Sequence, residues 1–156
     1  MLKPILLLML FVSTAALAQR DIAGTYRLIS TTAKFDTGEE EKYNDETGYI
    51  IYGRDGRMMV LLVRGKRPRP ESVEKMTDEQ RVQLFKTVTA YSGKYTFDGK
   101  TVTHHVDVSW NEVFNGMNLE RHVTRAGNRV MLTTAPSRRS SDGKMGVRTL
   151  TFEKVD

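Results

Sequence analysis

Two of the three histidines and the only tryptophan of the chain lie close together, at His104, His105 and Trp110. Histidine can take up or release a proton near neutral pH, so a histidine inside a fold is a candidate for acid–base chemistry or for anchoring a ligand. The surrounding residues alternate in character, as they do in a β-strand with one buried face. The mainly apolar face carries Val102, His104, Val106, Val108 and Trp110. If the protein has a functional site, one wall is expected on this strand, although the pattern identifies neither ligand nor reaction.

This strand is expected to pair with the next one, 117–125, across a loop. If Trp110 and Met117 flank the loop, His104 lies opposite Val123, and the apolar faces of the two strands coincide. The same register gathers four metal-ligating side chains on the outer face: His105 opposite His122, and Asp107 opposite Glu120. No supporting shell can be identified around them, so we expect a solvated polar face rather than a metal site.

His104 and Arg121 become inward polar groups in this register. A buried arginine or histidine is costly unless it is hydrogen-bonded. The pair therefore forms a satisfied interior network, anchors a ligand carboxylate or carbonyl, or takes part in acid–base catalysis, and the sequence leaves these alternatives open. The other side chains expected to contact a ligand are Trp110, Tyr91, Tyr95, Tyr49 and Met59. No cofactor or metal motif is present, and no cofactor is expected.

The first 18 residues have the pattern of a secretory signal peptide. Lys3 precedes an apolar run, and the small residues up to Ala18 fit a cleavage site before Gln19. We therefore expect 1–18 to be removed and 19–156 to form one exported domain, periplasmic or secreted; an uncleaved anchor is the alternative reading. No later stretch approaches the roughly 20 apolar residues of a transmembrane helix, so stable membrane insertion is not expected.

Composition narrows the classes of function. The absence of cysteine rules out disulfides, thiol catalysis and thiolate metal sites. The net charge of +5, or +4 once Lys3 leaves with the signal peptide, is spread over the chain apart from one basic cluster: Arg64, Lys66, Arg67 and Arg69. This cluster is either a solvated loop or a patch for an anion or a partner. No nucleic-acid motif accompanies it, so nucleic acid is not expected as a partner.

Hydrophobic periodicity predicts eight strands. They are expected at 24–33, 48–52, 57–64, 91–97, 101–110, 117–125, 129–134 and 146–153. Turns such as Asp98-Gly99 between them favour an all-β fold, an eight-stranded antiparallel up-and-down barrel, with a sandwich as the main competitor. The strand 57–64 is apolar on both faces, so its outer face is expected to be covered.

One helix is predicted at 78–90, inserted between the third and fourth strands. Thr77 and Gln80 form a capping box, after which Val82, Phe85 and Val88 recur at helical spacing. This apolar stripe needs an apolar partner. We expect the helix to lie over or beside one mouth of the barrel, with Phe85 as its anchor.

Several blocks of the sequence follow one another as in a known family. The most specific are Ala90–Tyr95 (AYSGKY) and Thr103–Val106 (THHV), separated by an Asp-Gly turn. Further blocks are Gly24–Leu28, Gly48–Tyr52, Asp55–Met58, Arg64 and Arg67-Pro68. With them the chain resembles the lipocalin-like domain family. The resemblance implies a calycin-type barrel whose floor is closed by an aromatic residue, here Tyr26, under an arginine of the last strand, here Arg148.

The resemblance does not assign a function, because relatives in biosynthetic clusters look like cyclases or isomerases. The leading hypothesis is an exported carrier or sensor that holds a small, largely apolar, lipophilic molecule in the barrel. One alternative is a cofactor-free cyclase or isomerase in which His104 or a tyrosine moves a proton. The other is a structural or protein-interaction module with a filled barrel. We expect binding rather than catalysis.

Overall fold

The computed structural model describes residues 22–139 and 143–155. The long strands are β1 (Gly24–Phe35), β3 (Thr47–Tyr52), β4 (Arg57–Val63), β5 (Val88–Phe97), β6 (Thr101–Ser109), β7 (Asn118–Ala126), β8 (Arg129–Thr134) and β10 (Met145–Lys154). The short strands are β2 (Glu40–Tyr43) and β9 (Ser137–Arg138). The helices are α2 (Asp78–Lys86) and the 3-10 turn η1 (Glu112–Phe114). The predicted signal peptide lies outside the described residues.

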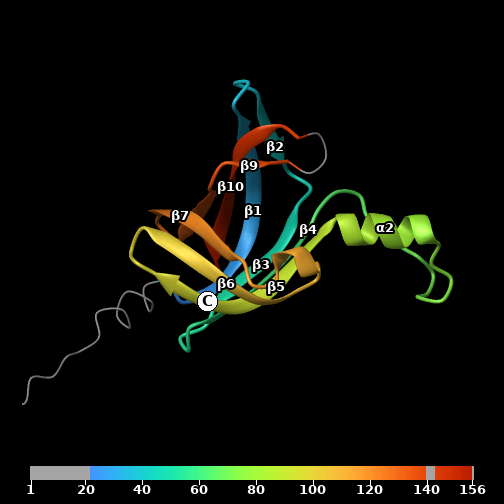
Figure 1. Ribbon diagram of the computed structural model, residues 1–156, viewed down its shortest axis with the longest axis horizontal. Coiled ribbons are helices and arrows are strands. Elements are labelled where there is room, and N and C mark those ends of the chain that lie inside the picture. Colours follow the sequence, from blue (N-terminus) through green and yellow to red (C-terminus); the bar gives the residue numbers. More distant parts are fainter. Residues whose placement is uncertain (1–21, 140–142, 156) are drawn as a thin grey trace, which may run out of the picture.

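The long strands form a closed antiparallel barrel (Figure 1). Neighbours hydrogen-bond in the order β1-β3-β4-β5-β6-β7-β8-β10, and β10 pairs with β1 to close the ring. The predicted eight-stranded up-and-down barrel with one inserted helix is therefore confirmed, and a sandwich is excluded. The short strands β2 and β9 lie in segments expected as loops, where they pair with β1 and β10.

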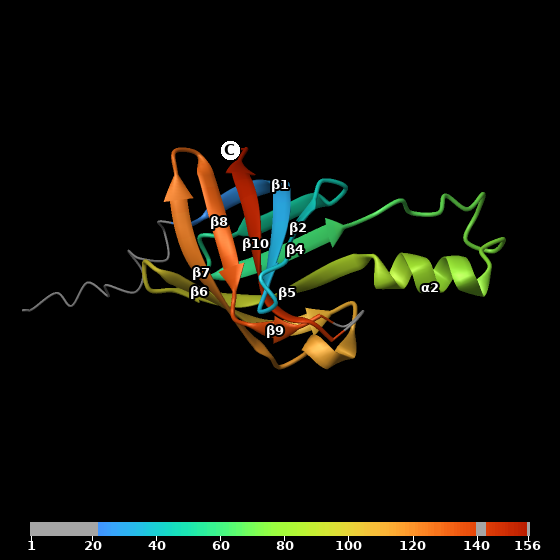
Figure 2. The same ribbon diagram turned by 90° about the horizontal axis from the view of Figure 1, so that it is seen from above.

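The two ends of the barrel are filled differently. The turn end carries the tight turns at 53–56, 98–100 and 127–128, and the helix end carries α2 and η1 (Figures 1 and 2). Buried side chains fill the interior towards the turn end: Tyr26, Tyr52, Tyr95, Phe97, Val102 and Phe152. Towards the helix end, buried side chains such as Val106 and Leu119 are accompanied by inward-facing ones that are only partly buried, among them Leu62 and Thr89. The inward-facing side chains are therefore buried less completely at the helix end.

Helix α2 projects away from the barrel instead of covering a mouth (Figure 2). Its capping box forms as predicted, but the helix ends at Lys86 and the chain enters β5 at Val88. Because strand pairing takes Val88, the apolar stripe is shortened, and the Phe85 side chain remains 49% exposed. The predicted lid is therefore wrong. Among the described residues, no helix combines the length and apolar character needed to span a membrane.

The outer face of β4 also differs from expectation. Met59 and Leu61 point outwards and are about half exposed, and no described element covers them. They pair directly with Ile51 and Tyr49 of β3, which are exposed as well. The prediction of a cover over this strand is wrong for the described part of the chain.

A β-bulge interrupts the alternation of β6. Gly93 pairs with Val106 while Ser92 pairs with Val108, so Asp107 is the extra residue. The bulge turns Val108 to the outside, where it is exposed, although the sequence pattern placed it inside.

The pairing of β6 with β7 is shifted from the predicted register. His104 lies opposite Leu119 and His105 opposite Asn118, four residues away from the expected partners. The strand β6 runs to Ser109, but its pairing with β7 ends at His105. Beyond that point the loop begins: η1 folds inside it, and the Val106 backbone bonds to Gly116 and Met117. An even shift keeps each side chain on its face, so the predicted inward direction of His104 survives the wrong register.

Candidate functional site

A chain of polar side chains crosses the interior of the barrel. The His104 ring, 1% exposed, lies between two phenols: its Nε2 is 2.8 Å from the Tyr52 hydroxyl and its Nδ1 is 2.9 Å from the Tyr91 hydroxyl. The three residues come from β3, β5 and β6, whose alternation turns all of them inward. Both ring nitrogens thus have partners, as a buried histidine requires.

His104 is neutral in this setting. Burial, reinforced by the positive charge of Arg121 and by His105, lowers the pKa of His104 from 6.5 to about 3. A neutral imidazole carries one N–H and one bare nitrogen, so it donates to one phenol and accepts from the other. Burial also raises the pKa of Tyr52 well above its ordinary value and raises the pKa of Tyr91. All three groups are therefore uncharged near neutral pH.

Arg121 lies close enough to this network for its charge to act on Tyr52, Tyr91 and His104. It lies on β7, is half-buried, and donates through Nη1 to the Glu120 backbone carbonyl at 2.7 Å, while its positive charge opposes the effect of burial on the pKa of Tyr91. Within residues 22–139 and 143–155, it forms no ion pair with a carboxylate. An inward guanidinium with neutral partners keeps donor capacity and positive charge for an anionic oxygen.

The other residues predicted to bind a ligand are distributed over three places. The Tyr95 hydroxyl donates to the Gly53 carbonyl at 2.9 Å, so it closes the turn end. Trp110 lies at the helix end, where it stacks on Phe114 at 5.0 Å and its Nε1 donates to the Phe85 carbonyl. Tyr49 and Met59 lie on the outer face, 48% and 56% exposed, so their expected interior position is wrong.

The floor residues implied by the family resemblance are not neighbours. The Tyr26 hydroxyl donates to the Ile22 carbonyl at the turn end. Arg148 pairs with Ala33 near the opposite end of β1, bonds to Glu46 at 2.9 Å and lies over the Tyr43 ring. The expected cover of Tyr26 by Arg148 is therefore wrong, because the strand register separates the two residues by most of the length of β10.

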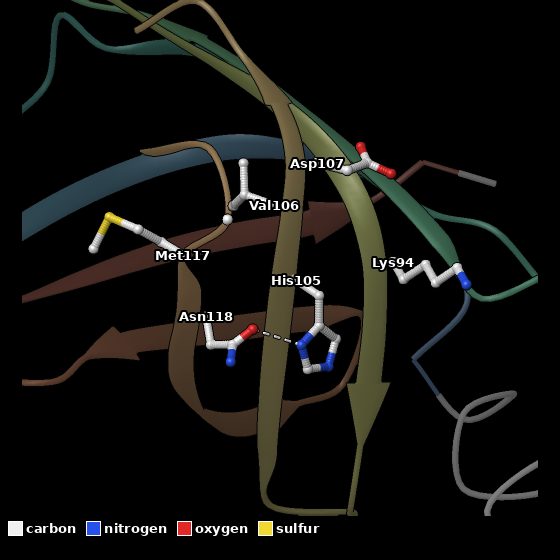
Figure 3. Close-up of a pocket in the computed structure, with 7 residues that line it drawn as sticks. Lys94, His105, Val106, Asp107, Met117 and Asn118 are labelled. Atoms are coloured by element: carbon white, nitrogen blue, oxygen red, sulfur yellow. Dashed lines mark hydrogen bonds between the residues drawn. The ribbon is translucent and has the colours of Figure 1, made fainter. Parts of the chain in front are cut away.

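An open depression of about 330 Å³ lies outside the barrel, along β5, β6 and the start of β7 (Figure 3). His105 faces Asn118 across it, with 2.7 Å between Nδ1 and Oδ1, and its Nε2 contacts Thr96 at 3.1 Å. The predicted pairing of His105 with His122 is wrong, because His122 lies opposite Thr101. Among the described residues, no group of three or more His, Asp or Glu side chains is arranged to hold a metal.

Tyr52 is the member of the interior network that the sequence did not predict. Its position was readable from the alternation of β3, because Ile50 and Tyr52 share a face that is buried in the structure. The missing information was which distant strand supplies a partner, since Tyr52 and His104 meet across the barrel.

Comparison with known proteins gives one match and one negative result. Residues 23–155 match the family model described as a lipocalin-like domain. No curated protein matches the chain.

Proposed function

The chain belongs to the lipocalin-like domain family, and we propose that its barrel binds a small molecule with a largely apolar body and an anionic oxygen, such as a carboxylate. The molecule enters from the helix end and its anionic group meets Arg121. We also propose that the protein is exported, with residues 1–18 as the signal peptide; amino-terminal sequencing of periplasmic or secreted protein should then begin at Gln19.

The observation that carries this proposal is the positive charge of Arg121, which has no carboxylate partner among the described residues. This charge acts on Tyr52, Tyr91 and His104, and the guanidinium hydrogen-bonds to the Glu120 carbonyl. An inward charge without a counter-ion is costly, and a ligand carboxylate would remove much of that cost through charge-assisted hydrogen bonds. The buried Tyr52–His104–Tyr91 chain supports the receiving position by fixing the Tyr91 ring.

The surroundings suit an apolar body. Four hydrophobic side chains pack against the core while remaining partly accessible: Leu62, Trp110, Phe114 and Leu150. The filled turn end leaves the helix-end half as the part where a ligand could lie. Small-molecule sites usually combine such an apolar lining with a few fixed polar groups.

A matched pair of probes tests the proposal. Decanoate and decanol share an apolar chain and differ in the carboxylate, and Trp110 fluorescence reports binding of either. We expect decanoate to bind at least about tenfold more tightly than decanol, because a hydrogen bond to a charged group contributes about 1.5–3 kcal/mol. Arg121→Gln should remove this preference, whereas Arg54→Gln, an exposed arginine at the turn end, should preserve it.

Two outcomes would contradict the proposal. One is an Arg121→Gln protein with an unchanged decanoate preference. The other is a wild-type protein that binds neither probe and shows no bound small molecule in native mass spectrometry after purification from its own host. The second outcome would favour a module with a filled barrel.

A cyclase or isomerase is the second candidate, and the hydrogen-bonded chain through Tyr52, His104 and Tyr91 is the observation that favours it. With a pKa of about 3, His104 is a poor proton acceptor near neutral pH, but it can relay a proton between two phenols. His104→Gln would then abolish turnover while leaving ligand affinity within a few-fold; an equal loss of both would mark a binding role.

A further inference from the structure

The segment between β4 and β5, residues 64–87, forms a projecting arm. It contains α2, which extends beyond the barrel at the helix end in both views (Figures 1 and 2). Arg64 and Arg67 fix its base by donating to the carbonyls of Lys86 and Thr87. These two members of the basic cluster therefore bind carbonyls at the C-terminal end of α2, so their guanidiniums are not surrounded by solvent alone.

The arm is rich in basic residues. It holds seven basic and four acidic residues, a net charge of +3 out of +5 for the whole sequence. Three of its exposed cations form no ion pair with the described residues: Lys66, Arg69 and Lys86. These cations are thus carried on a protruding part of the molecule, where they can approach an anionic surface.

Exposed apolar side chains lie beside these charges. Val82 and Phe85 on α2 are each 49% exposed, and Val113 on η1 is 74% exposed. Trp110 joins the two elements, with its ring 6.4 Å from Phe85 and 5.0 Å from Phe114. The helix end therefore presents a ridge of apolar side chains, which we define as Val82, Phe85, Trp110, Val113 and Phe114.

We propose that the arm and this apolar ridge form a docking surface for an anionic lipid bilayer. The cations face lipid headgroups, and the exposed tips of the ridge enter the interfacial layer. Docking is peripheral, and it presents the helix end of the barrel to the membrane. The inference is independent of ligand binding in the barrel.

The shape and chemistry of the surface favour a bilayer over other anionic partners. The apolar residues lie on protruding elements, so they need a soft apolar layer to enter. Single-stranded nucleic acids stack their bases on aromatic rings. In the ridge the Trp110 and Phe114 rings already stack on each other at 5.0 Å, and the most exposed member is an aliphatic residue, Val113. An acidic protein would have to supply a groove complementary to the ridge.

Vesicle flotation with the mature chain tests the proposal. Binding to phosphatidylcholine vesicles containing about one third phosphatidylglycerol should exceed binding to phosphatidylcholine alone, and a blue shift of Trp110 emission should accompany it. Replacing Lys66, Arg69 and Lys86 by Gln should weaken binding about 100-fold, since each cation near the surface contributes about fivefold. The same change at Arg54, Lys94 and Lys100, exposed cations elsewhere, should weaken it far less.

A second pair of variants tests the apolar contribution. Val82→Gln with Val113→Gln should reduce binding, whereas Ile51→Gln with Met59→Gln, on the exposed outer face of β3 and β4, should not. Equal effects of the two charge triples, equal effects of the two apolar pairs, or equal binding to both vesicle types would each overturn the proposal. Tighter binding to a single-stranded oligonucleotide than to anionic vesicles would overturn it in favour of nucleic acid.

Discussion

Acidification should destabilise this barrel through His104. Burial and the charge of Arg121 lower the pKa of this residue from 6.5 in an unfolded chain to about 3 in the fold. Between these values the unfolded chain binds a proton that the folded protein excludes, so the free energy of unfolding falls as the pH falls. Each pH unit inside this window costs about 1.4 kcal/mol. From about pH 7.5 to about pH 5, the expected loss is therefore about 2 kcal/mol.

Urea unfolding followed by Trp110 fluorescence measures this loss. His104→Gln removes the titrating group, so its free energy of unfolding should change by less than about 0.5 kcal/mol over the same pH range. The doubly substituted control His105→Gln and His122→Gln should keep the full loss, because neither ring lies inside the barrel. Carboxylates titrate mostly below this range. A His104→Gln protein that loses as much stability as the wild type would refute the reasoning.

Two further predictions concern stability. Gly93→Ala should cost about 3 kcal/mol in urea unfolding, because its Cβ would lie 1.9 Å from the His105 carbonyl oxygen across the bulge; Ser92→Ala is the control, and a similar small loss for both would contradict this. Tyr52→Phe should cost about 1–3 kcal/mol by leaving His104 Nε2 without its partner, and an unchanged unfolding midpoint would count against the buried network.

The fold was largely predictable because its signals are local. Alternating residues and tight turns such as Asp98-Gly99 define strands whose backbone groups are satisfied by pairing with their neighbours in sequence. Eight short antiparallel strands of this kind favour closure into a barrel. The capping box at Thr77 was equally local, and it forms as predicted. The end of the helix was harder to predict, because Val88 fits both the apolar spacing of the helix and the alternation of the following strand.

The register of β6 and β7 could not be read in the same way. Hairpin register depends on loop conformation, and the sequence 110–117 gave no sign of the 3-10 turn in the loop, beside which the pairing of β6 with β7 ends at His105. The bulge at Asp107 has a clearer cause, since any side chain at Gly93 would collide with the backbone of the neighbouring strand. A glycine inside a strand was the available signal, and it marks a close backbone approach of this kind.

The candidate site was predicted in part. His104 was placed inside by alternation alone, and this placement was correct despite the wrong register. Its partners could not be deduced, because Tyr52 contacts it from a strand distant in sequence, and the charge of Arg121 acts on both His104 and Tyr91. The errors at Tyr49 and Met59 have the opposite cause. Large apolar residues were assigned to the interior, but the pleat of β3 and β4 turns these two outwards.

The neutrality of His104 also orients the hydrogen bonds of the site. The single N–H of His104 must point to one of the two phenols, and its bare nitrogen accepts from the other. If the N–H pointed to Tyr52, the Tyr52 hydroxyl hydrogen would have no acceptor at a position only 2% exposed, which costs about 1–3 kcal/mol. If Tyr52 donates to Nε2 and Nδ1 donates to Tyr91, the unused hydrogen is instead the Tyr91 hydroxyl hydrogen. Tyr91 is 8% exposed against 2% for Tyr52, so this arrangement leaves the unused donor at the more accessible of the two phenols.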